Sequence, residues 1–290
     1  MTNIMRAMLF AVPDILSPAG NVSTNNRLYL QVAYRSVDDA PVARAIIESV
    51  HFRPPPPHNP VHDVAIAVLK GVGGRVQRVR PDPERADWWE GPIVEVSFQR
   101  AEATDAVLGA LRDFTELRKL NLGLTRVTDA GMVNLSHLGL LEHLDLSGTV
   151  VTDKGLEVLN ALPRLQSLSI ARAAITGPGF AHAKDLPDLR EISAPNGGIT
   201  DAGMAGFKDL KHLRVLALSR NRIGDAGIAQ LRGLWELEEL RIAGTGITDA
   251  GLKSLEGLKR LKVLDLTNTR VTATGIGALE KAVPGLKIIR

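Results

Sequence analysis

The sequence predicts an α/β solenoid, a curved array in which a parallel sheet forms the concave side and short helices form the convex side. Leucines recur at a constant interval of 24 residues from Leu117 to Leu261. Within each interval, apolar residues first alternate and then recur at helical spacing, and an aspartate separates the two patterns. A small α/β cap is expected before the array, because residues 1–92 lack the period.

Residues 1–60 are expected to form an irregular N-terminal region. Within it, residues 27–34 alternate loosely between apolar and polar side chains and predict a strand. A helix is expected from Asp39 to about residue 52, before the proline run that starts at Pro54.

Residues 61–92 are expected to form a helix–strand cap. Residues 61–69 predict a helix that stops at the glycines following it, and residues 75–80 predict a strand. Trp88 and Trp89 are expected to belong to this cap. The array needs such a cover because the apolar face of its first repeat has no preceding repeat to bury it.

Each repeat is expected to begin with a short strand. Apolar residues stand at positions 1, 4 and 6 of the repeat, as at Leu141, Leu144 and Leu146. Successive side chains of a strand point to opposite faces, so positions 4 and 6 point into the core and positions 3, 5 and 7 point outward. Parallel pairing needs a return path longer than a tight turn, which the rest of the 24-residue period supplies across the convex side.

A polar turn and a short helix complete the repeat. Position 9 is usually threonine, and we expect a stacked side-chain ladder there that satisfies turn amides. Position 13 is an aspartate followed by apolar residues at positions 16, 19 and 22, which predicts a helix N-cap and one buried helical face. The position 9 residues are Thr125, Thr149, Asn221, Thr245 and Thr269, and the aspartates are Asp105, Asp129, Asp153, Asp201, Asp225 and Asp249.

The repeats between residues 175 and 200 depart from this pattern. Gly177 replaces the aspartate, and Pro178 follows at the first helical position, where a proline is tolerated because that amide has no intrahelical partner. We expect a local loss of regular convex helix or a change in curvature there. The other consensus positions replaced are Pro187, Pro195, Gly197 and Gly198.

The repeated phrase resembles that of the leucine-rich-repeat family. It reads Leu-Glu-His-Leu-Asp-Leu-Ser-Gly-Thr-Val-Val-Thr-Asp-Lys-Gly-Leu from Leu141 to Leu156, a weaker copy begins at Ile93, and a fragment restarts at Leu286. We count about eight repeats and a terminal stub over residues 93–290. The pattern LxxLxLxxTxVTDxGLxxLxxL is similar to short repeats of F-box-associated and ribonuclease-inhibitor-like proteins and of environmental bacteria. The resemblance implies a leucine-rich-repeat solenoid and, less directly, a role in binding.

No catalytic, cofactor or metal site is predicted. The chain has 0 cysteines, which excludes a disulfide framework and thiolate metal sites. His58 and His62 have the spacing of helical metal ligands, but Pro60 lies between them and no further ligand is near. Residues 70–75 are glycine-rich like a phosphate loop, but they follow a helix and are interpreted as a helix stop. No GxSxG motif is present.

The composition points to a cytoplasmic protein without a membrane span. The net charge is +3, and charges of both signs are spread along the chain, so nucleic-acid binding is not favoured. No apolar run approaches the ~20 residues that a membrane helix needs. Residues 7–12 form a short apolar segment that leaves secretion as the alternative, although Pro13 and Asp14 interrupt it.

The outward strand positions predict a concave surface that binds another protein without catalysis. Parallel stacking brings positions 3 and 5 of all repeats into one face, with small residues in the middle and charged residues at the ends. This face carries no Trp, Tyr or Phe, so we expect a polar or acidic partner that binds with modest affinity. The candidate contact residues are His143, Asp145, Ser169, Glu191, Arg214, Glu239 and Arg241.

Two other functions stay open. One is an adaptor or secreted effector of a ubiquitin-type or host-directed pathway, although no F-box pattern precedes the repeats and the repeats lack the cysteines of that subfamily. The other is a nucleic-acid-contacting scaffold that uses the arginines near the strand ends. The stub from Leu286 to Arg290 predicts an edge strand able to support weak self-association.

Leu146→Ala tests the register of the repeat. If position 6 fills the core, removing this side chain leaves a cavity and lowers the free energy of unfolding by about 2–5 kcal/mol. Denaturant unfolding measures the loss. A change below about 0.5 kcal/mol would contradict the inward assignment.

Overall fold

The computed structural model describes residues 60–78 and 92–290. Every described residue belongs to one compact unit, Pro57–Arg290. The expected strand at 27–34, the expected helix from Asp39, the tryptophan pair and His58 lie outside the described residues.

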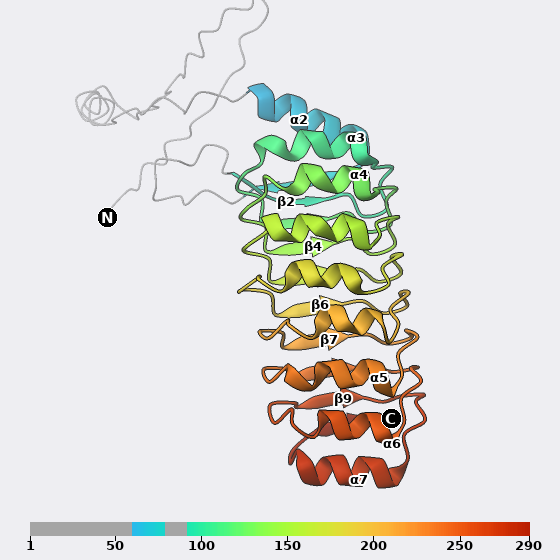
Figure 1. The fold of residues 1–290 in the computed structure, drawn as a ribbon. Helices are drawn as coiled ribbons and strands as arrows, with labels where there is room; N and C mark the ends of the chain where they lie inside the picture. Colours follow the sequence, from blue (N-terminus) through green and yellow to red (C-terminus); the bar gives the residue numbers. More distant parts are fainter. Residues whose placement is uncertain (1–59, 79–91) are drawn as a thin grey trace, which may run out of the picture. The chain divides into compact units, whose positions relative to one another are not determined.

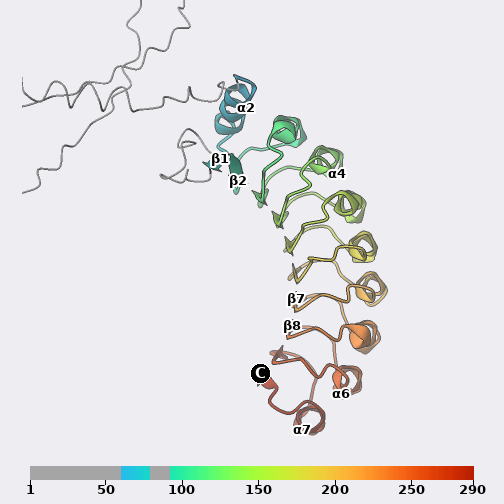
Figure 2. The same cartoon turned by 90° about the vertical axis from the view of Figure 1, so that its left-hand side faces the viewer.

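A ten-stranded sheet in sequence order forms the inner side of this unit. Strand β1 is antiparallel to β2, and every later neighbour pair is parallel, as expected for stacked repeats. Figure 2 shows the strands along the inside of an arc and the helices along its outside, which confirms the curved α/β solenoid. The strands are β1 (Arg75–Arg78), β2 (Ile93–Ser97), β3 (Lys119–Asn121), β4 (His143–Asp145), β5 (Ser167–Ser169), β6 (Glu191–Ser193), β7 (Val215–Ala217), β8 (Glu239–Arg241), β9 (Val263–Asp265) and β10 (Lys287–Ile289).

Helical turns form the convex side, one set to each repeat (Figure 1). Four of the eight sets are an α-helical turn continued by a 3₁₀ turn. The convex elements are α3 (Asp105–Leu108) with η2 (Gly109–Asp113), α4 (Asp129–Met132) with η3 (Val133–Leu135), η4 (Asp153–Ala161), η5 (Pro178–Ala183), η6 (Gly203–Phe207), α5 (Asp225–Ile228) with η7 (Ala229–Gly233), α6 (Asp249–Leu252) with η8 (Lys253–Leu255), and α7 (Ala273–Ala282).

The expected irregularity falls on the convex side alone. Element η5 lies within the substituted segment and η6 follows it, and both contain only 3₁₀ turns, in agreement with the expected loss of regular helix. The preceding η4 is also entirely 3₁₀, so the proline and glycine substitutions are not the sole cause. Strand pairing continues through this segment without a register shift, with Leu168 opposite Ile192 and Ile192 opposite Leu216.

The core is one continuous stack of mainly aliphatic side chains, which also includes Phe98, Phe114, Phe180 and Phe207. Leu144, Leu146, Leu156, Leu159 and Leu162 are all buried, as the repeat pattern predicts. Since each repeat supplies the same inward positions, its side chains pack on those of the neighbouring repeats, and no repeat buries its core alone.

A helix and a strand close the first end of this core. Helix α2 (Pro60–Gly71) and strand β1 agree with the helix expected at 61–69 and the strand expected at 75–80. Ala65 and Leu69 of α2 are buried in the same cluster as the first repeat. At the other end, β10 pairs with β9 alone, and the expected self-association through its open side stays a prediction.

The position 9 side chains do not form the expected ladder to turn amides. Each threonine hydroxyl instead donates to a carbonyl three residues earlier in its own repeat, at 2.7 Å from Thr149 to Leu146 and from Thr245 to Ile242. Only Asn221 joins two repeats, because its amide nitrogen also donates to the Ala194 carbonyl and its oxygen accepts from the Ile199 amide. A hydroxyl is too short to satisfy its own turn and reach the next repeat.

The expectation that each aspartate caps its own helix is wrong. Where a side chain caps the N-terminus of a convex helix, it is the preceding threonine, as at Thr128, whose hydroxyl accepts from the Ala130 amide at 3.3 Å. The aspartate reaches the next repeat instead: Asp129 accepts from the Thr152 amide at 2.8 Å and from the Thr152 hydroxyl at 2.6 Å. The same pair of bonds joins Asp105 to Thr128, Asp225 to Thr248 and Asp249 to Thr272.

A glycine at position 15 makes room for this bond. At Gly227, a Cβ atom would lie 2.5 Å from Oδ1 of Asp201, the oxygen that accepts from the Gly227 amide at 3.0 Å. The equivalent glycine of most other repeats faces the preceding aspartate in the same way. The Thr-Asp-x-Gly phrase therefore encodes one contact between neighbouring repeats, which we call the inter-repeat lock.

Gly227→Ala tests the lock. The added methyl group meets the Asp201 carboxylate, and we expect the free energy of unfolding to fall by roughly 1–3 kcal/mol. Gly277→Ala is the matched control, since Gly277 lies inside α7 with nothing within 4 Å of an added Cβ. Alanine favours a helix, so this control should gain about 0.5–1 kcal/mol. Equal effects of both changes in denaturant unfolding would contradict the lock.

The lock also predicts a dependence of stability on pH. Burial alone would raise the pKa of Asp153, but hydrogen bonds from Thr176, Gly179 and Gly177 outweigh it and hold this pKa below its ordinary value of 3.8. A carboxylate with a lowered folded pKa stabilises the fold above its unfolded pKa, and the contribution disappears as pH falls through the folded value.

We therefore expect Asp153→Asn to flatten the acid limb of the stability profile. Between about pH 5 and about pH 2, the free energy of unfolding should fall less steeply in this variant than in the parent chain. Asp185→Asn, which removes an exposed carboxylate without a hydrogen bond among the described residues, should leave the slope unchanged. Parallel curves for the parent chain and Asp153→Asn would contradict the assignment.

Candidate functional site

Six of the seven predicted contact residues lie on the concave sheet. They occupy positions 3 and 5 of strands β4, β5, β6 and β8, and strand pairing places Asp145 beside Ser169 and Glu239 opposite Val215. The residues between these strands are small, since Ser193 and Ala217 occupy position 5. The six are His143, Asp145, Ser169, Glu191, Glu239 and Arg241.

A shallow hollow of about 190 Å³ lies over the first strands of this face. It brings three of the predicted residues, His143, Asp145 and Ser169, next to Lys119 and Glu95. The sequence analysis did not single out Lys119 or Glu95 as contact residues, although both stand at position 3. The rest of the lining is Val96, Leu120, Asn121, Leu144 and Ser167.

Two polar side chains of the hollow are held by the strand ends. Oδ1 of Asn121 accepts from the Gly123 amide at 2.8 Å, and Oδ1 of Asp145 accepts from the Ser147 amide at 2.9 Å. These bonds fix both side chains while one carboxylate oxygen of Asp145 stays available. Lys119 and His143 form no hydrogen bond or ion pair within the described residues. The hollow thus presents one acceptor, Asp145, together with two groups, Lys119 and His143, that are free to engage a ligand.

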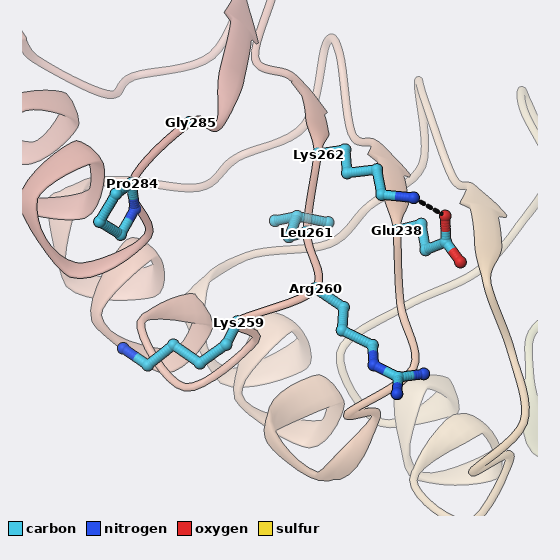
Figure 3. Close-up of a pocket in the computed structure, with 7 residues that line it drawn as sticks. All are labelled: Glu238, Lys259, Arg260, Leu261, Lys262, Pro284 and Gly285. Atoms are coloured by element: carbon cyan, nitrogen blue, oxygen red, sulfur yellow. Dashed lines mark hydrogen bonds and ion pairs between the residues drawn. The ribbon is translucent and has the colours of Figure 1, made fainter.

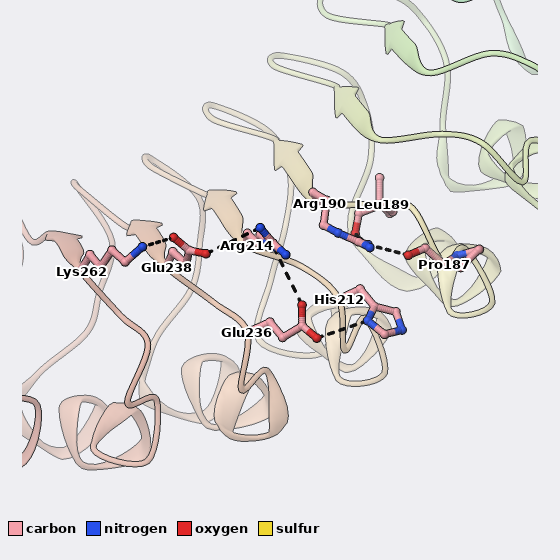
Figure 4. Close-up of polar contacts among 8 residues, drawn as sticks. All are labelled: Pro187, Leu189, Arg190, His212, Arg214, Glu236, Glu238 and Lys262. Carbon is pink, nitrogen blue, oxygen red and sulfur yellow. Dashed lines mark hydrogen bonds and ion pairs between the residues drawn. The ribbon is translucent and has the colours of Figure 1, made fainter.

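Arg241 and Arg214 are less accessible to a ligand than the strand pattern suggests. The Nε of Arg241 donates to Glu239 within the same strand, so the guanidinium is already paired. Arg214 lies outside β7, which begins one residue later. It contacts Glu236 at 3.9 Å and Glu238 at 4.0 Å, as Figure 4 shows.

The residues at position 2, just before each strand, form a row that we call the upstream edge. Charged pairs connect successive repeats along it. Arg118 contacts Glu142 at 2.5 Å, and Lys262 contacts Glu238 at 2.5 Å on the side away from Arg214. The hydrogen bond from Lys262 holds the pKa of Glu238 below its ordinary value. Opposite charges 24 residues apart were the sequence signal for these pairs, and the sequence analysis missed it.

A second hollow of about 420 Å³ opens beside the last of these pairs. Lys259, Arg260 and Lys262 line it together with Glu238, and Pro284 and Gly285 close one side (Figure 3). Lys259 is held by the Ala282 carbonyl at 2.8 Å. Since Glu238 and a backbone carbonyl already bind two of the cations, this hollow offers less free charge than its composition suggests.

The described residues hold no group of three or more His, Asp or Glu side chains placed to bind a metal ion. In the same residues, no helix is both long enough and apolar enough to cross a membrane.

A model of the leucine-rich-repeat family matches residues 115–136, 140–159, 209–231 and 237–255. Each match covers a strand of the concave sheet or the convex turns of a repeat. The chain is a leucine-rich-repeat protein. No curated protein sequence matches this leucine-rich-repeat protein significantly.

Solved structures share the fold of this leucine-rich-repeat protein. Internalin C2 from Listeria monocytogenes is similar with a TM-score of 0.56 at 20% identity, over 78% of this chain and 91% of the internalin. A leucine-rich-repeat protein of Leptospira interrogans is similar with a TM-score of 0.50 at 24% identity, over 63% of this chain and 45% of that one. At these identities the likeness establishes the architecture and nothing finer.

Proposed function

We propose that this leucine-rich-repeat protein is a non-enzymatic scaffold that binds a protein partner on its concave face. Leucine-rich-repeat folds generally mediate protein–protein interaction. The observation that carries the proposal is the hollow over β2–β5, where Lys119, His143 and Asp145 surround small serine side chains. A serine floor lets a partner approach the backbone, while the surrounding charges fix its orientation.

The remaining predicted residues extend this surface toward the C-terminal strands. Glu191 lies on β6 with an exposed side chain, and the Glu239–Arg241 pair lies on β8. A ligand that binds Arg241 has to displace Glu239 from it. We therefore expect the hollow to supply most of the binding free energy and β8 to contribute less. The face lacks exposed aromatic anchors, which supports a polar partner and modest affinity.

Site-specific cross-linking tests the proposal. A photoreactive amino acid at Ser167, within the hollow, should give discrete adducts in a lysate of the source cells, and excess unmodified protein should suppress them. The same group at Lys208, exposed on the convex side, is the matched control and should give none of these adducts. Adding Lys119→Glu and His143→Glu should reduce the Ser167 adducts roughly tenfold with unchanged thermal unfolding.

The opposite pattern would contradict the concave assignment. Equal adducts from Ser167 and Lys208 would indicate non-specific contact. Adducts at Ser167 that survive both charge reversals would place the binding energy outside the hollow. Adducts that disappear on nuclease treatment would replace the protein partner with a nucleic acid.

A further inference from the structure

The turn that follows each strand contains a residue in the left-handed region of backbone conformation. This residue stands at position 8 in every repeat, with φ between 56° and 67°. Glycine and asparagine adopt this conformation at little cost, whereas a side chain with a long aliphatic stem is strained in it. The position 8 residues are Arg100, Leu124, Gly148, Arg172, Asn196, Arg220, Gly244 and Asn268.

Three repeats place an arginine where the fold favours glycine or asparagine. The turn itself does not require arginine, because Gly148, Asn196 and Gly244 form it with the same hydrogen bond. That bond joins the position 8 amide to the position 7 carbonyl of the next repeat, at 2.7 Å for both Gly148 and Arg220. Residues held in strained conformations without a structural need point to a functional constraint.

Three further arginines lie two residues downstream, at position 10. Together these turns carry six exposed arginines on one side of the arc, and we call this row the arginine edge. Between positions 7 and 11 of the eight repeats there is no lysine, and Glu102 is the single acidic residue. The arginine edge consists of Arg100, Arg126, Arg172, Arg220, Arg222 and Arg270.

The arginine edge differs from the upstream edge in how its charges are used. On the upstream edge, Arg118, Arg214 and Lys262 contact glutamates of neighbouring repeats. Among the described residues, none of the six side chains of the arginine edge forms a hydrogen bond or an ion pair. The aspartates that follow these turns leave the arginines unpaired because their carboxylates bind the next repeat, as at Asp129 and Asp225.

The backbone beneath these side chains is ordered. The Arg172 amide donates to the Pro195 carbonyl at 3.1 Å, and the Arg222 amide donates to the Ile199 carbonyl at 3.0 Å. Anchored turns that carry free guanidinium groups form a preorganised surface, because a ligand orders only side chains when it binds.

Exposed aliphatic side chains interrupt the row of charges. Leu124 at position 8 is 46% exposed and Val150 at position 10 is 57% exposed. A surface of arginines and aliphatic side chains without lysine is typical of a protein interface, in which arginine is enriched and lysine depleted. A phosphate backbone needs dense positive charge and offers aliphatic groups little contact, whereas Leu124 and Val150 interrupt this row.

We propose that the arginine edge is a second docking surface, which binds an extended acidic segment of a protein. Guanidinium groups pair with carboxylates through two parallel hydrogen bonds, and repeats about 4.8 Å apart present them at intervals along the row. The surface is separate from the concave hollow, so binding here does not depend on the concave assignment. An arginine at position 8 destabilises its turn, and the contact of its guanidinium group with a carboxylate of the partner explains why it is nevertheless present.

A labelled poly-L-glutamate peptide tests the proposal on the full chain by fluorescence anisotropy. Arg172→Glu, Arg220→Glu and Arg222→Glu together should weaken binding at least about tenfold. The triple variant Lys184→Glu, Lys208→Glu and Lys253→Glu changes the net charge equally on the convex side and should bind like the parent chain. Loss of peptide binding in the concave pair Lys119→Glu and His143→Glu, with binding retained in the arginine triple variant, would instead assign the peptide to the hollow and overturn the proposal.

A second variant distinguishes a binding role from a structural one. Arg172→Asn with Arg220→Asn keeps the turn, since asparagine already forms it at Asn196 and Asn268, and removes two guanidinium groups. We expect an equal or higher unfolding temperature together with weaker peptide binding. A lower unfolding temperature with unchanged binding would overturn the proposal.

Two other outcomes would also overturn it. Equal loss of peptide binding in the convex control would show that net charge alone attracts the peptide. Tighter binding of duplex DNA, or of vesicles that contain phosphatidylserine, than of poly-L-glutamate under the same salt would assign the arginine edge to a phosphate-bearing partner.

Discussion

The stack of repeats depends on a carboxylate that binds the next repeat and not its own helix. Asp129 receives both the amide and the hydroxyl hydrogen of Thr152, and that threonine in turn caps the helical turn of its own repeat. Each lock therefore joins two repeats and starts a convex turn in one step. Because a charged acceptor makes stronger hydrogen bonds than a neutral one, a single side chain suffices at each junction.

One junction lacks this lock and holds together in another way. Gly177 stands where the aspartate is expected, and the backbone of the following repeat comes so close that a Cβ on Gly177 would lie 2.6 Å from the Gly203 carbonyl oxygen. Phe180 and Phe207 stack beneath it with ring centroids 4.2 Å apart. Aromatic contact and close backbone packing thus replace the carboxylate, and the parallel sheet continues across the junction.

The sequence predicted burial correctly at positions that repeat along the chain. It did not predict the hydrogen bonds of side chains that have two possible partners. The inward leucines follow from alternation within one strand, so Leu144 and Leu146 could be placed without the structure. Thr152 and Asp153 are adjacent and both residue types cap helices, so the sequence alone does not say which one turns back and which one reaches Thr176. Arg214 was grouped with the outward residues although it stands at position 2, and the repeat register already gave Val215 as the first residue of its strand.

Different positions of the repeat form the core and the exposed surfaces, so the concave face and the arginine edge can carry different side chains. Positions 4, 6, 12, 13 and 15 carry the core and the lock, so they are nearly constant along the chain. Positions 3 and 10 contribute side chains that lie outside the core and the lock, whereas position 5 side chains such as Asn121 and Asp145 also accept hydrogen bonds from the turn amides of their own repeats. Position 8 lies between these classes, because its left-handed backbone limits the stable choices while its side chain points to solvent. An arginine at this position is therefore more informative than one at position 3, since glycine and asparagine form the same turn with less strain.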